Sequence, residues 1–591
     1  MANDALLNRL RSLVVEMMDM SEYKTASFWC NKILSLPNSD KNDVYKQAKC
    51  FFLLREYHRA AHCIKSRNLH LTDLASRHLA AKCHFIAKEF KEAYEILECN
   101  ELDATGKRMD FELESSEEDR SLESAIYMLK GHIFEAMDNR GEAVIWYRKA
   151  LERDVYCFEA LDCLIQHQML SQEEEENLME TLRNDNQGTK EENQLIFYLY
   201  QSHLKKYAKP DDSPAPEGFN SILSENVDIL TSAAERHYYN CDFHKCMELT
   251  ERVLKIDIYH TRCLPIHISC LMELKKTNTL FDLAHRLVDL YPESAVSWYA
   301  VGCYYLMINK MDAARRFLSK ATTLDNVFGP AWLLYGHSFA IESEHDQAMA
   351  AYFKAFHLMK GCHLPLLYIG LEYGLTENTK FSEQFFQQAL AIAPNDPFVL
   401  HELGVISYQM KDYHAAHQHF SNALDLIKNK RDVSCLPEKW EPVLNNMAFV
   451  LRRLKKYDEA LDYHKQALVL CSLNPSTYSA IGYIHILTGK YKEAVDYFHK
   501  ALGLKRDDLC AQSLLAIALE QMWKENSPLF NELPPYEDES FMEKNYLRNN
   551  LLDESPHEDR LLDDKDLEKS SSENDTENNA SGLDVEMDLS P

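Results

Sequence analysis

Small and aromatic residues return along this chain at a constant interval of 34 positions. Trp298 and Trp332 are one such pair. Glycine and alanine each keep the interval at four places: Gly302, Gly336, Gly370 and Gly404, and Ala321, Ala355, Ala389 and Ala423. An ordinary bundle of helices has no reason to keep a fixed step. The pattern therefore predicts an array of repeated structural units.

An interval of 34 residues is the length of a tetratricopeptide repeat, in which helix A and helix B are joined by a short turn. Small residues at fixed places let these helices cross closely, and aromatic residues fill the space between crossings. The residues that match these structural places are Trp298, Gly302, Trp332, Gly336, Gly370, Gly404 and Gly482. We predict an all-α superhelix of about a dozen helix-turn-helix units.

Breaks in the pattern divide the chain into four parts. Residues 1–204 form an N-terminal array, and residues 205–220, which are rich in proline, form a linker or irregular break. Residues 221–523 form a C-terminal superhelix with a peptide-binding groove. Residues 524–591 are predicted to be an acidic disordered tail, because 18 acidic residues outnumber 5 basic ones between Tyr536 and Pro591. An acidic loop is expected at residues 101–121.

Composition narrows the class of protein. The 16 glycines and 18 prolines are few for 591 residues, as expected when helices are joined by short turns. The net charge of -29 disfavours nucleic acid and anionic membrane as partners, and no apolar run is long enough for a membrane span. No Cys-x-x-Cys pair occurs among the 16 cysteines, which favours reduced thiols over zinc sites.

The sequence contains none of the motifs that commonly mark an enzyme active site. Phosphate-binding glycine loops, zinc-protease helices and nucleophile elbows are all missing, so we expect no enzyme activity, cofactor or metal. His414, His417 and His419 could bind a metal, but a solvated helix face explains them better. Four serines precede proline in the break or the tail and are candidates for phosphorylation: Ser213, Ser527, Ser555 and Ser590.

With no catalytic motif present, the sequence favours a binding function. Stacked repeats form a concave groove lined by the A helices, which can hold a partner. Repeat geometry places a mixed aromatic, aliphatic, His and Asn surface in this groove, which suits an extended or helical peptide. The predicted groove residues are Tyr299, Leu306, Leu333, His337, Leu367, Leu371, His401, Tyr408, Asn445 and Tyr483.

Several strings resemble one family within the tetratricopeptide proteins. They include AERHYYNCDF at 234–243, SWYAVGCYYLM at 297–307, YGHSFAIESEHDQAMAAYF at 335–353 and STYSAIGYIH at 476–485. The resemblance covers roughly residues 7–510 and is to the cell division cycle protein 16 family, subunit six of the anaphase-promoting complex, or cyclosome. The tail does not share it.

The resemblance implies a non-catalytic scaffold of a cell-cycle ubiquitin ligase that acts in mitosis. It implies a homodimer formed by the N-terminal repeats, and a superhelix that encloses a small subunit like cell division cycle protein 26. It also implies contact with other tetratricopeptide subunits, such as cell division cycle protein 27. The implied location is the cytoplasm and nucleus, with the centrosome and spindle.

Two other functions are compatible with a repeat array. A co-chaperone that clamps an acidic peptide, or another peptide-binding adaptor, would need a basic groove, and the predicted groove positions hold no Lys or Arg. An enzyme with an added catalytic domain would need more than the short acidic segment that follows the repeats.

Overall fold

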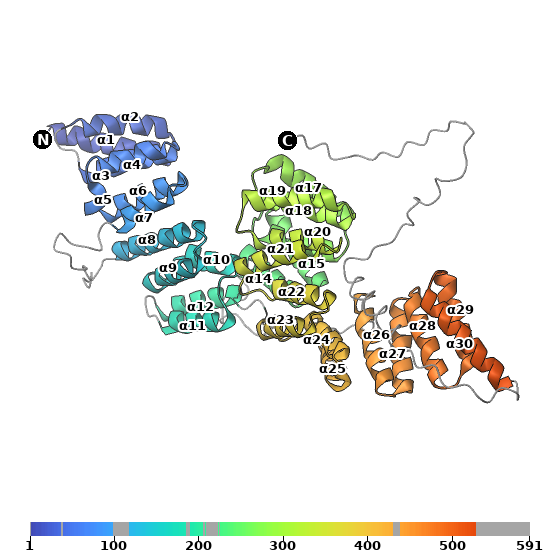
Figure 1. The fold of residues 1–591 in the computed structure, drawn as a ribbon. Coiled ribbons are helices and arrows are strands. Elements are labelled where there is room, and N and C mark those ends of the chain that lie inside the picture. Colours follow the sequence, from blue (N-terminus) through green and yellow to red (C-terminus); the bar gives the residue numbers. More distant parts are fainter. Residues whose placement is uncertain are drawn as a thin grey trace, which may run out of the picture.

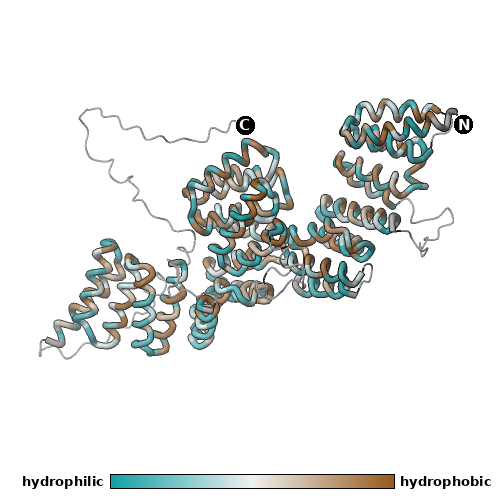
Figure 2. The backbone as a smooth tube through the Cα atoms, turned by 180° about the vertical axis from the view of Figure 1, so that it is seen from behind, coloured by the Kyte–Doolittle hydropathy of each residue, from teal (hydrophilic) through white to brown (hydrophobic). Residues whose placement is uncertain are grey.

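The computed structural model describes residues 2–36, 40–98, 117–184, 189–204, 207, 223, 225–429 and 438–526. All regular structure in these residues is helical, which confirms the predicted all-α fold. The helices stack in pairs along an elongated path, with the N-terminal helices at one end and α26–α30 at the other (Figure 1). Hydrophobic and hydrophilic residues alternate along the helices (Figure 2), as two-faced helices require.

The N-terminal array contains eleven helices of two to five turns and one single turn. These are α1 (Ala2–Asp19), α2 (Tyr23–Leu34), α3 (Lys41–Leu53), α4 (Tyr57–Lys65), α5 (Leu69–Thr72), α6 (Leu74–Ile86), α7 (Phe90–Glu98), α8 (Glu117–Ala136), α9 (Arg140–Arg153), α10 (Phe158–Gln166), α11 (Gln172–Asn184) and α12 (Lys190–Leu204). Helix α8 begins at Glu117, so the last residues of the expected acidic loop are helical instead.

The C-terminal superhelix continues the same alternation of A and B helices. It contains α14 (Val227–Tyr239), α15 (Phe243–Ile256), α16 (Cys263–Glu273), α17 (Thr277–Leu290), α18 (Ala295–Met307), α19 (Met311–Leu324), α20 (Gly329–Ala340), α21 (His345–Leu358), α22 (Leu364–Leu375), α23 (Thr379–Ile392), α24 (Pro397–Gln409), α25 (Tyr413–Asn429), the 3-10 turn η1 (Glu438–Trp440), α26 (Glu441–Arg453), α27 (Tyr457–Leu470), α28 (Pro475–Leu487), α29 (Tyr491–Leu504) and α30 (Leu509–Asn526). Helix α30 ends at Asn526, so the first three residues of the predicted disordered tail, 524–526, are helical instead.

Close crossing of helices A and B explains the spacing of the glycines. A Cβ atom at Gly336 would lie 2.3 Å from the ring of Tyr352, and one at Gly370 would lie 2.5 Å from the ring of Phe386. Both rings are almost fully buried. Any larger residue at these places would push helix B away from helix A, so the glycine step follows from packing.

Each turn between helices A and B contains a residue with a left-handed backbone, and in most repeats this residue is not a glycine. Positive φ angles recur at the same 34-residue step: Cys241, Lys275, Asn309, Ser343, Glu377 and Lys411. Helix A often begins with a side-chain cap, as where Asn226, Asp396 and Asn474 accept hydrogen bonds from the first N–H groups of α14, α24 and α28. The left-handed turn residue and the N-terminal cap set where one helix ends and the next begins, and so fix the length of each unit.

The superhelix closes on itself across a contact that we call the seam. It joins Asp138, Arg140 and Gln168 of the N-terminal array to Lys354, Leu358 and Gly361. Arg140 donates to the carbonyl of Leu358, 218 residues further along the chain, or roughly six repeats of 34 residues. The N–H of Gly361 donates to the carbonyl of Gln168 at 2.8 Å. One superhelical turn is therefore locked by direct contact.

Candidate protein-binding interior of the superhelix

Tyr207, which lies in the predicted linker between the two arrays, packs against the C-terminal superhelix. The Tyr207 hydroxyl lies 3.0 Å from Nδ1 of His363, whose Nε2 lies 2.6 Å from Asp396. The ring of Tyr207 also packs at 5.3 Å from the ring of Tyr239. Gln168 donates to the Tyr239 hydroxyl at 2.7 Å. The seam and the linker thus meet at the start of the C-terminal superhelix.

Tyrosine and histidine side chains continue this lining along the A helices. The Tyr299 hydroxyl lies 2.8 Å from the Ser269 hydroxyl, and its ring packs edge-on against Phe328. His337 bonds through Nδ1 to the Tyr352 hydroxyl at 2.7 Å and lies 4.2 Å from the ring of Tyr368. Burial lowers the pKa of His337 to about 4. His337 is therefore uncharged at neutral pH.

A buried polar network joins α26, α27 and α28. Asn445, which is 1% exposed, donates to Glu441 and to the Thr477 hydroxyl, and its Oδ1 accepts from Nδ1 of His464 at 2.8 Å. Burial lowers the pKa of His464 to about 3, so His464 is neutral and donates to the Asn445 oxygen. Nearby, the buried Ser479 hydroxyl on α28 has no hydrogen-bond partner within the described residues.

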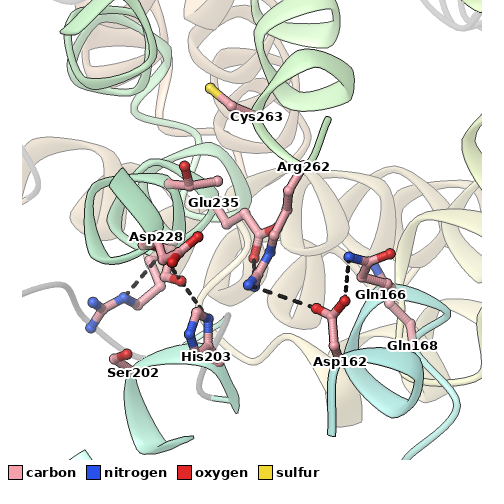
Figure 3. A network of polar contacts seen from close by, with 12 residues as sticks. Asp162, Gln166, Gln168, Ser202, His203, Asp228, Glu235, Arg262 and Cys263 are labelled. Atoms are coloured by element: carbon pink, nitrogen blue, oxygen red, sulfur yellow. Dashed lines mark hydrogen bonds and ion pairs between the residues drawn. The ribbon is translucent and has the colours of Figure 1, made fainter. Parts of the chain in front are cut away.

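A second polar network ties α10 and α12 to α14 and α16 (Figure 3). Arg262 lies between Glu235 at 3.6 Å and Asp162 at 3.9 Å, and Gln166 donates to Asp162 at 2.8 Å. Burial raises the pKa of Asp162, and Arg262 opposes that rise. His203 bonds to the Ser232 hydroxyl at 2.7 Å. These contacts fix the direction in which the N-terminal array meets the superhelix.

The structure places most of the predicted groove residues inside the packed wall. Those almost out of reach of solvent are Tyr299, Leu306, Leu333, Leu367, His401, Tyr408 and Asn445. His337, Leu371 and Tyr483 stay half-buried. Contact between a partner and any of these ten residues remains a prediction.

Most of the structural repeat residues lie where helices cross. Trp298 of α18 stacks on Phe317 of α19, whereas Trp332 packs edge-on against Tyr335 of its own helix, α20. The remaining glycines face the side chain of a B helix: Gly302 faces Leu318, Gly404 faces Phe420 and Gly482 faces Phe498. The four candidate phosphorylation sites, Ser213, Ser527, Ser555 and Ser590, lie outside the described residues, as does most of the linker.

The described residues contain one group of three potential metal ligands, His84, Glu89 and Glu92. His84 Nδ1 lies 2.6 Å from Glu89. The same pairing between the end of helix A and the start of helix B recurs at His237 and Asp242, 3.6 Å apart. A contact that recurs between repeats serves the turn rather than an ion. His414, His417 and His419 do not converge into such a group.

No helix in the described part of the chain is long and apolar enough to cross a membrane.

The sequence analysis missed Tyr207, Arg140 and Gly361, which close the superhelical turn. None of them belongs to a repeat consensus, and their partners lie more than 150 residues away along the chain. A repeat motif describes only residues that are close in sequence, so it cannot predict a contact between residues this far apart.

Comparison with known proteins agrees with the repeat geometry. Models of the tetratricopeptide repeat match residues 124–154 and 441–507, and the model described as anaphase-promoting complex, cyclosome, subunit 3 matches residues 19–99. The fold and its lining define a tetratricopeptide-repeat protein.

Two curated relatives and one solved structure narrow that class. The human cell division cycle protein 16 homolog is 51% identical over 87% of this chain and 84% of its own length. Anaphase-promoting complex subunit 6 of Arabidopsis thaliana is 39% identical over 87% of this chain and 96% of its own. The crystal structure of the APC/C hetero-tetramer Cut9-Hcn1 matches with a TM-score of 0.75 and 31% identity, covering 87% of this chain and 96% of that one. The chain belongs to the cell division cycle protein 16 family, subunit six of the anaphase-promoting complex, a cell-cycle ubiquitin ligase.

Proposed function

We propose that this chain is a non-catalytic scaffold subunit of the anaphase-promoting complex and supports ubiquitination of mitotic regulators by holding other subunits. The observation that carries the proposal is the locked superhelical turn lined by Tyr, His and Asn side chains, in a chain alike over most of its length to Cut9. Such a surface binds peptides and offers no catalytic constellation. The expected location is the cytoplasm and nucleus, with the centrosome and spindle.

Three kinds of partner belong to this proposal. The C-terminal superhelix, residues 221–523, holds a small subunit like cell division cycle protein 26 in its interior. This is supported by the pairing of Cut9 with Hcn1 in the similar structure. The N-terminal array, residues 1–204, forms a homodimer, and other tetratricopeptide subunits, such as one like cell division cycle protein 27, pack against the outside.

Purification from mitotic cells tests the assembly. A tagged full-length chain should co-purify with other subunits of the ligase, identified by mass spectrometry. If no ligase subunit is recovered, the proposal is wrong. Analytical ultracentrifugation should give about twice the 68.7 kDa chain mass for the chain alone. A monomer mass would remove the homodimer from the proposal.

Binding of the small subunit is best tested at residues that stay half-buried. Tyr299→Ala with Tyr408→Ala should weaken binding, but both rings are packed in the wall, so stability would change too. Leu371→Ala with Tyr483→Ala removes surface from the interior with less damage. The expected loss in affinity is about tenfold, with Val469→Ala, which is 83% exposed, as the control. Equal affinity for all variants would show that the groove is placed wrongly.

A co-chaperone that clamps acidic C-terminal peptides is the alternative. The ten predicted groove positions carry no Lys or Arg, which speaks against a carboxylate clamp. Titration of the full chain with a chaperone C-terminal peptide should show no saturable binding. Tight binding of that peptide together with failure to recover ligase subunits would favour the alternative.

A further inference from the structure

One connection between two repeats is longer than its neighbours. Ala416, Ala460 and Ala494 take the same place near the start of three successive B helices, but the first interval is 44 residues and the second is 34. The extra length lies between the end of α25 at Asn429 and the start of α26 at Glu441. The repeat itself does not require this length, so the contacts made at its described end, η1, indicate its role.

Lys439 of η1 reaches across to the first repeat of the C-terminal superhelix. Its ammonium nitrogen lies over the ring of Phe243, the first residue of α15, at 4.2 Å from the ring centre. The same nitrogen lies 4.8 Å from the ring centre of Trp440 and 5.5 Å from that of Phe398 on α24. A cation within about 6 Å of a ring centre is attracted by the electron-rich face of the ring. One ammonium group therefore joins three aromatic rings, two of which lie on other helices.

A carboxylate acts on the same ammonium group. Glu273 is the last residue of α16, and its side chain still reaches solvent. Desolvation by the surrounding helices raises the pKa of Glu273, and the charge of Lys439 opposes that rise. Burial also raises the pKa of Tyr238, and the nearby Glu273 and Tyr299 raise it further. The contact made by Lys439 therefore adjoins the part of the lining that contains Tyr299.

We call this contact the clasp, and it consists of Lys439, Phe243, Phe398, Trp440 and Glu273. It spans 196 residues between Phe243 and Lys439, as the seam spans 218 between Arg140 and Leu358. The two closures differ in chemistry. The seam bonds to the backbone carbonyls of Leu358 and Gln168, whereas the clasp depends on one long, flexible side chain. The clasp opens when that side chain turns away from the rings.

We propose that the clasp controls access to the interior of the superhelix, because it holds an enclosed protein segment while Lys439 lies on the rings and frees that segment when it opens. This inference rests on the proposed function and adds to it a device for loading and release. Its position supports it: the clasp joins the first repeat of the C-terminal superhelix to the start of the last five helices. Charge is essential to it, because a neutral side chain of the same length loses the attraction to the three rings and to Glu273.

Amide hydrogen exchange of the full-length chain tests the clasp without a partner. Lys439→Met keeps the length of the side chain but removes its charge, and should speed exchange in α15, α16 and α26 by about threefold or more. Lys439→Arg keeps a cation that stacks on aromatic rings, and should exchange as the wild type does. The control is Lys465→Met on α27, which removes a lysine that is 59% exposed and should leave exchange in α15 unchanged.

Release of the small subunit tests the control of access. A fluorescently labelled small subunit is bound to the full-length chain and then displaced by an excess of the unlabelled subunit. Release from Lys439→Met should be about threefold faster or more, because an open clasp removes one barrier to exit. Release from Lys439→Arg and from Lys465→Met should keep the wild-type rate.

Each outcome decides one point. Equal exchange in Lys439→Met and the wild type would overturn the clasp and leave the proposed function standing. Equal acceleration by Lys439→Met and Lys439→Arg would show that packing of the side chain matters and its charge does not, which also contradicts the clasp. Faster exchange with an unchanged rate of release would refute the control of access. A wild-type chain that binds no small subunit would refute the proposed function together with this control, while exchange still reports whether the clasp closes.

Discussion

Gly370 on α22 leaves no room for a side chain, because the ring of Phe386 on α23 occupies that space. Gly370→Ala should lower the free energy of unfolding by about 1–3 kcal/mol through overpacking. Gly503→Ala is the matched control: nothing lies within 4 Å of its Cβ position, so alanine should stabilise its helix by about 0.5–1 kcal/mol. Urea unfolding measures both variants, and equal effects would contradict the packing argument.

His267 on α16 makes stability depend on pH. It is buried and bonded to the Thr250 hydroxyl at 2.9 Å, and burial lowers its pKa from 6.5 to about 4, with Lys276 acting in the same direction. The unfolded chain therefore binds a proton between pH 6.5 and about 4 that the folded chain does not. Stability at this residue is complete above pH 6.5 and falls by about 1.4 kcal/mol per pH unit below it.

The measurement is urea unfolding of the full chain at several pH values between 7 and 4. His267→Gln, which cannot take up the proton, should have a shallower slope than the wild type by that amount. His244→Gln on the preceding helix, α15, replaces an exposed histidine and should keep the wild-type slope. If the slopes of all three proteins agree, the neutral state of His267 is refuted.

At the scale of elements, Asn445 of α26 holds three helices together. It bonds to Thr477 on α28 at 3.0 Å and to His464 on α27 at 2.8 Å. Asn445→Ala leaves Nδ1 of the buried His464 without its partner, while Thr477 keeps its bond to Glu441, and should cost about 2–4 kcal/mol. Gln387→Ala, which removes an exposed amide on α23, should stay within about 0.5 kcal/mol of the wild type. Thermal unfolding with both variants side by side decides between a structural and a negligible role.

Helix pairs were the part of the fold that the sequence could predict. The 34-residue step of Gly302, Gly336, Gly370 and Gly404 reports a local contact between adjacent helices, so it is visible in one chain. The turn residues were not visible, since Lys275 or Glu377 adopts the left-handed backbone that glycine usually marks.

The candidate site was harder to predict than the fold. Repeat geometry points a side chain to the concave face, but the curvature of the superhelix decides whether that face is open. Tyr299 is packed against Ser269 and Phe328 within the wall, whereas Leu371 keeps some exposure. Curvature depends on contacts such as the one between Arg140 and Leu358, which no repeat consensus contains.

At the scale of the whole molecule, Gly361 sets how closely the two arrays approach. A Cβ atom there would lie 2.5 Å from the carbonyl oxygen of Leu170, a backbone atom that cannot turn away. Gly361→Ala should open the seam while the helices stay intact. Small-angle X-ray scattering should then show a larger radius of gyration at unchanged helical content by circular dichroism. The Gly503→Ala variant provides the control, and identical scattering from both would show that the seam does not hold the turn closed.

The seam also orders events in time when the chain is made. Arg140 leaves the ribosome 218 residues before its partner Leu358. At synthesis rates of roughly 5–20 residues per second, the N-terminal array waits on the order of 10–40 seconds for that partner. Throughout this interval the seam is open, and Tyr299 and His337 leave the ribosome before it closes. The nascent superhelix therefore adds its helices one by one beside an open seam, which closes only after Leu358 has emerged.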